Sequence, residues 1–179
     1  MREQGKGCPT EGQCEKERQV YAFLDRLALC YKTVHHPPAA TMEDCRAVDE
    51  MLGARMCKNL FLKTRNGSAF YLLLMPAEKP FKTKQLSAQI GSSRLSFANE
   101  EELMQYLSCA PGSAGVLSLL FDKEDRVKLL IDRDLLEAEY IGCHPGINTA
   151  SVSLVVCDLI EKILPAFEKE PTYVTLTAE

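Results

Sequence analysis

The order of apolar and polar residues along the chain follows two periods, which together predict a mixture of helices and strands. Several stretches with helical spacing are bounded by capping residues such as Thr41 and Asn99, or by glycines such as Gly53 and Gly91. We therefore expect helices over 15–29, 42–52, 83–90, 100–107 and 158–167, the last of them capped by Asp158. Apolar runs of strand length predict strands over 31–35, 57–63, 68–75, 95–98, 116–120, 127–132, 139–143 and 150–156.

Two of these strands form the clearest local pattern. The runs over 57–63 and 68–75 flank Asn66-Gly67, a pair that accepts the positive φ angles of a tight type I′ turn. They therefore predict a β-hairpin. The second run is apolar on both faces, which is typical of a strand in the middle of a sheet.

Lys58 has an unusual place in the first strand of this hairpin. Strand alternation puts it on the same face as Leu60 and Leu62, which point into the core. Its ammonium group then lies at the mouth of the core and needs an anionic or polar partner. The alternative is an ordinary edge lysine whose long side chain bends out to water.

The predicted strands outnumber the helices, and most successive strands can pair antiparallel, for example 116–120 with 127–132 through a turn at 122–125. We predict an α+β fold, in which helices surround one twisted, mixed, mostly antiparallel and barrel-like sheet. Residues 1–14 are polar and charged and predict a flexible tail, whereas 15–179 predict one folded domain.

The chain has 179 residues and no apolar run close to the roughly 20 residues that a membrane-spanning helix needs. Its first residues do not resemble a secretory signal, so we expect a cytoplasmic protein. Eight cysteines are scattered through the chain, which favours reduced thiols. Cys8 and Cys14 are poorly spaced for zinc, and we expect neither a metal nor a cofactor. A metal-binding protein that uses these two residues with Cys143-His144 remains an alternative.

Charge is distributed unevenly along the chain. Residues 55–94 carry eight basic side chains and one acidic side chain, a net charge of +7, whereas the other thirteen basic and twenty-four acidic residues give −11. The negative net charge of the whole chain argues against broad, non-specific binding of nucleic acid. The basic stretch either docks one phosphate-bearing end of a partner or forms a solvated face without a partner.

Two loops carry groups that are suited to chemistry. Residues 142–151 place His144, Asn148 and Thr149 on a loop bent by proline and glycine, and a histidine exchanges protons near neutral pH. Residues 110–115 are small, so their backbone N–H groups are open to an oxyanion or an ester. Each loop also has a plainer interpretation: a histidine packed at the surface in the first, and a simple turn in the second. The chain contains no nucleophile elbow, P-loop, dinucleotide-binding fingerprint or His-Glu-x-x-His motif.

Four segments together resemble a known family. They are Lys58-Asn59-Leu60-Phe61-Leu62, Arg94-Leu95-Ser96-Phe97-Ala98, the loop at Gly112, and Gly142-Cys143-His144-Pro145-Gly146-Ile147-Asn148-Thr149-Ala150. Their order and spacing are those of the YbaK-type aminoacyl-tRNA editing family. Over roughly 35–167 the chain is most similar to the free-standing prolyl-tRNA editing branch, which looks like the editing insertion of bacterial prolyl-tRNA synthetase.

The resemblance implies a deacylase that acts in trans on mischarged tRNA(Pro), with alanine as the first expected amino acid and cysteine as its main competitor. By the same resemblance, four residues are catalytic. Lys58 is the key lysine and Asn59 is its neighbour, the loop at Gly112 approaches the aminoacyl group through its backbone, and His144 lines the pocket that tests side-chain size. The expected substrate-binding residues are Ser113, Ala114, Gly115, Arg94, Ser96, Asn148 and Thr149.

The implied partners are the acceptor end of tRNA(Pro) and, as an open question, prolyl-tRNA synthetase, with no membrane involved. In related sites a ribose hydroxyl of the substrate is thought to take part, so the lack of an evident Ser or Cys nucleophile agrees with the resemblance.

The chain departs from the family pattern at one position. The family's loop usually reads Gly-x-x-x-Pro, whereas Gly112-Ser113-Ala114-Gly115 is followed here by Val116. Valine frees φ and restores an N–H group, which leaves the loop's shape and the amino-acid specificity open. This departure also supports a rival hypothesis, in which the chain is a non-catalytic module that binds tRNA or the synthetase.

Overall fold

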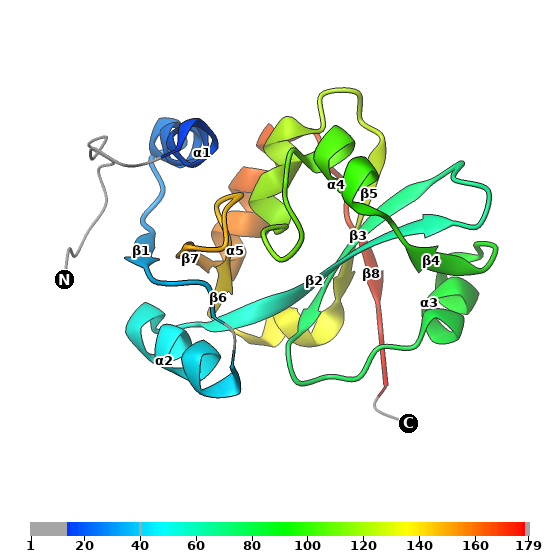
Figure 1. The fold of residues 1–179 in the computed structure, drawn as a ribbon, viewed down its shortest axis with the longest axis horizontal. Coiled ribbons are helices and arrows are strands. Elements are labelled where there is room, and N and C mark those ends of the chain that lie inside the picture. Colours follow the sequence, from blue (N-terminus) through cyan, green and yellow to red (C-terminus); the bar gives the residue numbers. More distant parts are fainter. Residues whose placement is uncertain (1–13, 40, 178–179) are drawn as a thin grey trace.

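The computed structural model describes residues 14–39 and 41–177, so the predicted tail lies outside the described residues apart from Cys14. Figure 1 shows a twisted sheet with helices around it. The strands are β1 (Lys32–His35), β2 (Arg55–Thr64), β3 (Phe70–Pro76), β4 (Leu95–Phe97), β5 (Val127–Asp132), β6 (Tyr140–Cys143), β7 (Ala150–Val155) and β8 (Thr172–Val174). The longer helices are α1 (Glu15–Arg26), α2 (Met42–Leu52), α3 (Thr83–Ile90) and α4 (Glu100–Leu107).

Shorter helical segments complete the order of elements: the 3₁₀ helices η1 (Val116–Phe121) and η2 (Arg133–Glu137), and then α5 (Val156–Asp158), the π-helical η3 (Leu159–Ile163) and α6 (Leu164–Ala166). Among the described residues, no helix combines the length and the apolar character needed to cross a bilayer.

The strands form one sheet in the order β1-β7-β6-β2-β3-β5-β8, and β4 pairs with β2 beside this path. Four pairings are antiparallel, namely β1–β7, β6–β7, β2–β3 and β2–β4. The pairings β2–β6, β3–β5 and β5–β8 are parallel. The predicted α+β fold with a mixed, mostly antiparallel sheet is therefore confirmed.

Strand β2 joins the two halves of the sheet. Its first residues pair in parallel with β6, with Met56 opposite Gly142, whereas its last residues pair with β4. Because parallel strands run in the same direction, the chain beyond Gly142 continues beside the chain beyond Met56. This register brings the segment Cys143-His144 alongside the segment Cys57-Lys58.

Both faces of the sheet are buried around β2 and β3. Cys57 and Phe61 belong to a large core cluster, whereas Leu62 belongs to a smaller cluster that contains Leu86 of α3. Strand β3 lies between β2 and β5, and its residues from Phe70 to Met75 are all buried. The prediction of a central strand, apolar on both faces, is confirmed.

Helix ends follow the predicted capping residues. Thr41 and Asn99 each form a capping box at the start of α2 and α4, in which the side chain accepts a hydrogen bond from the backbone three residues later. Gly53 and Gly91 end α2 and α3 in the left-handed conformation. Local sequence therefore sets these four boundaries.

The predicted strand over 116–120 is wrong, because this segment is the 3₁₀ helix η1. Its first turn is closed by the Ser118 backbone N–H, which donates to the Gly115 carbonyl, and by the Gly115 N–H, which donates to Ser118 Oγ. The predicted hairpin between 116–120 and 127–132 is wrong for the same reason. Strand β5 pairs instead with β3 and β8.

Two finer predictions also need correction. The hairpin between β2 and β3 is confirmed, but its loop is longer than a type I′ turn, since Thr64 N–H donates to Ala69 O and only Gly67 of the Asn66-Gly67 pair has a positive φ. The last helical segment begins at Val156 rather than at a cap formed by Asp158, which lies within the segment. Strand β8 was not predicted.

Gly142 is required where β6 pairs with β2, opposite Met56. A Cβ atom there would lie 2.7 Å from Met56 Sδ and 3.2 Å from Met56 Cα, and 2.8 Å from Leu52 Cδ2. We expect Gly142→Ala to lower the free energy of unfolding by about 1–3 kcal/mol, measured by urea denaturation, because the crowded site must shift backbone as well as side chains. The control is Gly67→Asn. Position 67 has open space around a Cβ atom, and its positive φ is one that asparagine tolerates. Equal losses in the two variants would contradict this packing explanation.

Candidate active site

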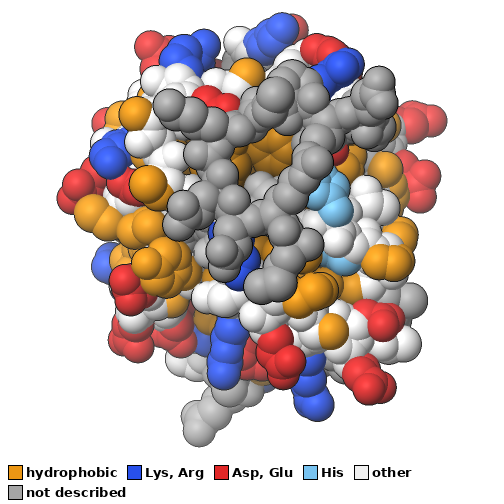
Figure 2. All heavy atoms as spheres, turned by 90° about the vertical axis from the view of Figure 1, so that its left-hand side faces the viewer, with side chains coloured by type: hydrophobic (Ala, Val, Ile, Leu, Met, Phe, Trp, Pro, Cys, Tyr) orange, Lys and Arg blue, Asp and Glu red, His pale blue; other side chains and the backbone are white. Residues whose placement is uncertain are grey.

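A cavity of about 700 Å³ lies beside the first half of β2, and we call it the active-site cavity. Its walls come from β2, α2, β7, the segments after β1 and β3, the loop at Gly112 and the loop after β6. On the face turned to the viewer in Figure 2, histidine side chains lie among hydrophobic ones. Of the residues predicted from sequence, the cavity is lined by Lys58, Gly112, His144 and Asn148.

Lys58 lies at the wall of this cavity and is half-buried. Its ammonium group donates a hydrogen bond to the backbone carbonyl of Lys79, over 2.7 Å. The side chain therefore has the polar partner that its place at the mouth of the core requires, and it does not simply bend out to water.

The side chain of Lys79 is itself held in place by two carboxylates, one at the end of β5 and one in η2. Its ammonium group lies 2.7 Å from Asp132 Oδ2 and 2.6 Å from Asp134 Oδ2. Burial alone would lower the pKa of Lys79, but the hydrogen bonds to Asp132 and Asp134 outweigh it and raise the pKa. Asp132 is fully buried at the end of β5, so a chain of contacts fixes the carbonyl that receives Lys58.

The loop at Gly112 contributes backbone to the cavity wall. Gly112 has a φ of +78°, which a residue with a side chain rarely adopts, although nothing lies within 4 Å of where its Cβ would be. A Cβ on Gly115 would lie 3.2 Å from the His144 carbonyl oxygen, so this loop packs directly against the backbone of the His144 loop. Ser113 and Gly115 are buried behind the wall, and Ala114 is half-buried.

His144 has a defined tautomer. Its Nδ1 lies 2.8 Å from the Ala150 carbonyl oxygen, which can only accept, so Nδ1 carries the proton. Burial lowers the pKa of His144, and the nearby His36 lowers it further, against the hydrogen bond to Ala150. The ring is therefore neutral at pH 7, and the lone pair of Nε2 remains as an acceptor.

The lowered pKa of His144 has a consequence for stability. Above pH 6.5 the folded and unfolded states both hold neutral histidine, so stability is fully retained; as pH falls below 6.5, the unfolded state binds the proton more readily, and stability declines. We expect the free energy of unfolding of the wild type to fall more between pH 7 and pH 5 than that of His144→Gln, measured by urea denaturation at both pH values. Parallel losses in both proteins would show that His144 does not drive the decline.

His36 is a wall residue that sequence reasoning missed. Its Nδ1 lies 2.7 Å from the Pro37 carbonyl oxygen and its Nε2 lies 2.8 Å from Ser151 Oγ, so both ring nitrogens are engaged. The rings of His36 and His144 lie 6.3 Å apart. The only local signal was the pair His35-His36 before two prolines. Its ring shapes the cavity and leaves no free nitrogen to act as a base.

Asn59 follows Lys58 in β2 but does not line the cavity. Its amide group donates to the Cys57 carbonyl oxygen, and among the described residues its buried Oδ1 has no hydrogen-bond partner. Thr149 is exposed, and its carbonyl oxygen accepts a hydrogen bond from the His36 N–H.

Arg94 and Ser96 lie at the other end of β2. Ser96 pairs with Lys63, five residues from Lys58, which is about 16 Å along a strand. Both residues are exposed and neither lines the cavity. The structure therefore does not bring them to the groups around Lys58.

Part of the positive charge over 55–94 is balanced within the molecule. The ion pairs are Arg55–Glu78, Lys63–Glu102 and Lys79 with Asp132 and Asp134. The pair Arg55–Glu78 is open to solvent, so its attraction is weak and can be exchanged for another partner.

The described cysteines are free, and three of them, Cys57, Cys109 and Cys143, are buried. Burial raises the pKa of Cys57 to about 12, so this thiol at the cavity wall stays protonated and is a poor nucleophile. Within 14–39 and 41–177 there is no group of three His, Cys, Asp or Glu side chains that could hold a metal ion. The alternative that involves Cys8 falls outside the described residues.

Three comparisons with known proteins are consistent with one another. The family described as "Aminoacyl-tRNA editing domain" matches residues 36–162. The prolyl-tRNA editing protein ProX of Acetoanaerobium sticklandii is 33% identical over 152 residues, which cover 85% of this chain and 92% of that protein. The prolyl-tRNA synthetase associated domain-containing protein 1 of Danio rerio is 30% identical over 145 residues, covering 80% of this chain and 78% of that protein.

A solved structure supports the fold. The crystal structure of a candidate trans-editing enzyme for prolyl-tRNA synthetase superimposes with a TM-score of 0.69 at 18% identity, and the match covers 93% of this chain and 100% of that chain.

Proposed function

Because the chain belongs to the aminoacyl-tRNA editing domain family, we propose that this deacylase acts in trans on mischarged tRNA(Pro), with alanyl-tRNA(Pro) as its first substrate. The observation that carries the proposal is the active-site cavity, where Lys58, Gly112 and His144 meet from three separate segments. An enzyme with this substrate would act in the cytoplasm, where tRNA is charged and used. A contact with prolyl-tRNA synthetase would deliver that substrate before it leaves.

The chemistry of the proposal needs stabilisation of negative charge. When water adds to the ester carbonyl, negative charge develops on its oxygen, and a nearby cation or N–H group lowers the barrier. Lys58 supplies a fixed cation at the cavity wall, and the loop at Gly112 offers backbone without a side chain in the way.

His144 would act as an acceptor rather than an acid. Its protonated Nδ1 is bound to Ala150, so the lone pair of Nε2 is available to a hydrogen bond from the attacking water. Cys57 remains a thiol, and Ser151 is fully buried with its hydroxyl bound to His36. Direct attack by water, aided by a ribose hydroxyl of the substrate, fits these residues better than a covalent intermediate on the protein.

Amino-acid choice would depend on the size of the cavity. Its apolar wall includes Val48, Met56 and Cys57. One methylene of difference is worth only about 1–3 kcal/mol in an apolar site, so excluding the larger proline ring by shape is the effective way to spare correctly charged tRNA.

The test is release of amino acid from alanyl-, cysteinyl- and prolyl-tRNA(Pro) under identical conditions. We expect alanyl-tRNA(Pro) to be hydrolysed and prolyl-tRNA(Pro) to be spared by at least about tenfold. Faster release of cysteine than of alanine would reassign the amino acid. No release from any of the three, with intact binding of tRNA, would identify a non-catalytic binding module instead.

A further inference from the structure

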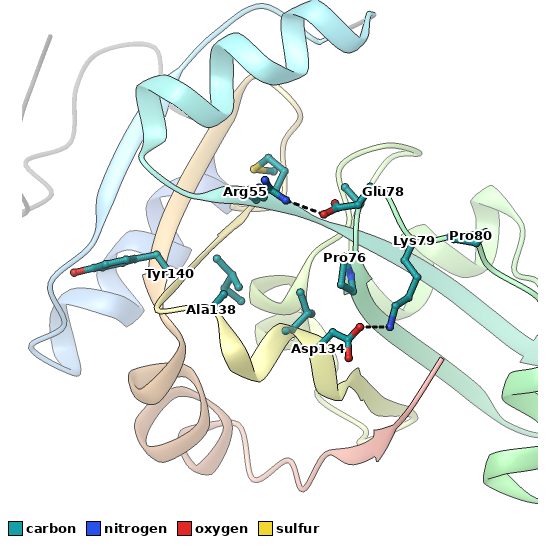
Figure 3. Close-up of a pocket in the computed structure, with 12 residues that line it drawn as sticks. Arg55, Pro76, Glu78, Lys79, Pro80, Asp134, Ala138 and Tyr140 are labelled. Atoms are coloured by element: carbon teal, nitrogen blue, oxygen red, sulfur yellow. Dashed lines mark hydrogen bonds and ion pairs between the residues drawn. The ribbon is translucent and has the colours of Figure 1, made fainter. Parts of the chain in front are cut away.

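A second cavity, of about 440 Å³, adjoins the active-site cavity. The two share a wall made of Arg55, Met56, Ala77 and Glu78. Figure 3 shows the second cavity, with the pair Arg55–Glu78 on one side and Lys79 pointing toward Asp134 on another. Its volume lies within the range of sites that bind small molecules.

Resting on the proposed function, we propose that the second cavity binds the base of the nucleotide that precedes the acylated one, with Arg55 contacting the phosphate between the two. If the acylated nucleoside occupies the active-site cavity, the next nucleotide of the single strand must lie directly beside it. The second cavity is a neighbouring space that shares a wall with the site. Another cavity also adjoins the site, at Arg46 and Asp49, but its wall carries the carboxylates of Asp49, Glu50 and Glu139, which repel a phosphodiester. Single-stranded ends of RNA are commonly recognised by such splayed-out bases.

The wall between the cavities suits a phosphate. Arg55 is 81% exposed, and Glu78, its partner at 2.8 Å, is 63% exposed. An exposed ion pair contributes little to stability, so Arg55 can leave Glu78 at low cost. A guanidinium group forms stronger, bidentate hydrogen bonds with a phosphate. A phosphodiester that crosses from one cavity to the other passes this side chain and can replace Glu78.

The second cavity also suits a base. Pro76, Leu135 and Ile141 give it apolar walls for the flat faces of a ring. The carboxylate of Asp134 and the ammonium of Lys79 lie 2.6 Å apart, so the site offers an acceptor beside a donor. A cytosine presents an amino donor beside acceptor atoms, and tRNA ends in the sequence CCA.

The same residue links the second cavity to the chemistry. Lys79 lines the second cavity, while its carbonyl oxygen accepts a hydrogen bond from the ammonium group of Lys58, which lines the active-site cavity. A base held against Lys79 therefore steadies the carbonyl that positions Lys58. Substrates that lack the preceding nucleotide lose this support.

The test compares alanyl-tRNA(Pro) with alanyl-adenosine, which has no preceding nucleotide. Ala138 lines the second cavity, is exposed and does not line the active-site cavity, so Ala138→Phe fills the second cavity from its rim. We expect the ratio of kcat/KM for the tRNA to kcat/KM for alanyl-adenosine to fall about tenfold in this variant. The matched control, Ala166→Phe at an exposed position of α6, keeps the wild-type ratio. An unchanged ratio for Ala138→Phe would overturn the proposal, and a merely structural defect would lower both kcat/KM values together.

A binding measurement separates this proposal from the proposed function. The dissociation constant of the trinucleotide CpCpA, measured by NMR titration, should rise about tenfold in Ala138→Phe and stay unchanged in Ala166→Phe. If the wild type hydrolyses neither ester, the proposed function fails, and this titration still decides whether the second cavity holds a base. Equal affinity of CpCpA for wild type and Ala138→Phe would contradict it.

Discussion

Replacing Lys58 by methionine is expected to lower kcat for alanine release from alanyl-tRNA(Pro) by about 10²- to 10³-fold. The reason is that Lys58 is a cation held at the cavity wall by a hydrogen bond of 2.7 Å to the Lys79 carbonyl oxygen. Methionine keeps most of the length and the apolar contacts of the side chain and removes the terminal ammonium group, with its charge and its hydrogen-bond donors. The effect should therefore appear in kcat, whereas the affinity for the rest of the tRNA changes little.

The matched control for this variant is Lys63→Met on the same strand. Lys63 is paired with Glu102 near the far end of β2 and does not line the cavity. We expect the Lys63→Met variant to lose this part-exposed ion pair and to keep the kcat of the wild type. Single-turnover rates for the three proteins, with thermal unfolding as a check of the fold, measure the difference. Equal rates for Lys58→Met and wild type would remove Lys58 from the mechanism.

The second large effect concerns stability. Lys169 is buried, and its ammonium group lies 2.6 Å from Asp122 Oδ2 and 2.8 Å from the Val127 carbonyl oxygen. Lys169→Ala would leave the buried Asp122 carboxylate without its cation, and removing one partner of a buried ion pair is strongly destabilising. We expect the free energy of unfolding to fall by about 3–5 kcal/mol, measured by urea denaturation.

Lys162→Ala is the control for this stability effect. Lys162 pairs with Asp158 one helical turn away, and its side chain is 51% exposed. Such a pair is worth about 0.3–0.5 kcal/mol. A loss for Lys169→Ala no larger than that of Lys162→Ala would show that the Lys169 cluster does not stabilise the fold.

Local signals in the sequence predicted much of the fold. The capping residues Thr41 and Asn99, and the glycines that end α2 and α3, mark boundaries through contacts within a few residues. The period of two in β2 placed Lys58 at the mouth of the core, because side-chain direction in a strand follows from position alone. Interactions of this kind need no knowledge of the tertiary structure.

What could not be predicted depends on contacts between distant segments. The run over 116–121 is apolar apart from Ser118, a pattern that does not distinguish a strand from a buried helical turn. Strand β8 has only three residues, and it forms because β5 offers it an edge. The parallel pairing of β2 with β6 joins segments far apart in the chain, and periodicity carries no information on which strands become neighbours.

The same limit explains the site residues. The segment 94–98 belongs to the pattern shared with the family, but β4 pairs with the far end of β2, so Arg94 and Ser96 lie away from Lys58. His36 reaches the cavity because β1 pairs with β7, next to the His144 loop. The second cavity forms where the start of β2, the end of β3 and the start of β6 meet η2, and no local pattern in the sequence predicts it.

The most direct test of the account is the position of a non-hydrolysable substrate. A crystal structure with alanyl-adenosine joined by an amide instead of an ester would show where the acyl group binds. We expect the acyl carbonyl between the Lys58 ammonium group and the backbone at Gly112, with His144 beside it. An analogue bound outside this cavity, with Lys58 still bound only to the Lys79 carbonyl oxygen and no contact to the acyl group, would contradict the account.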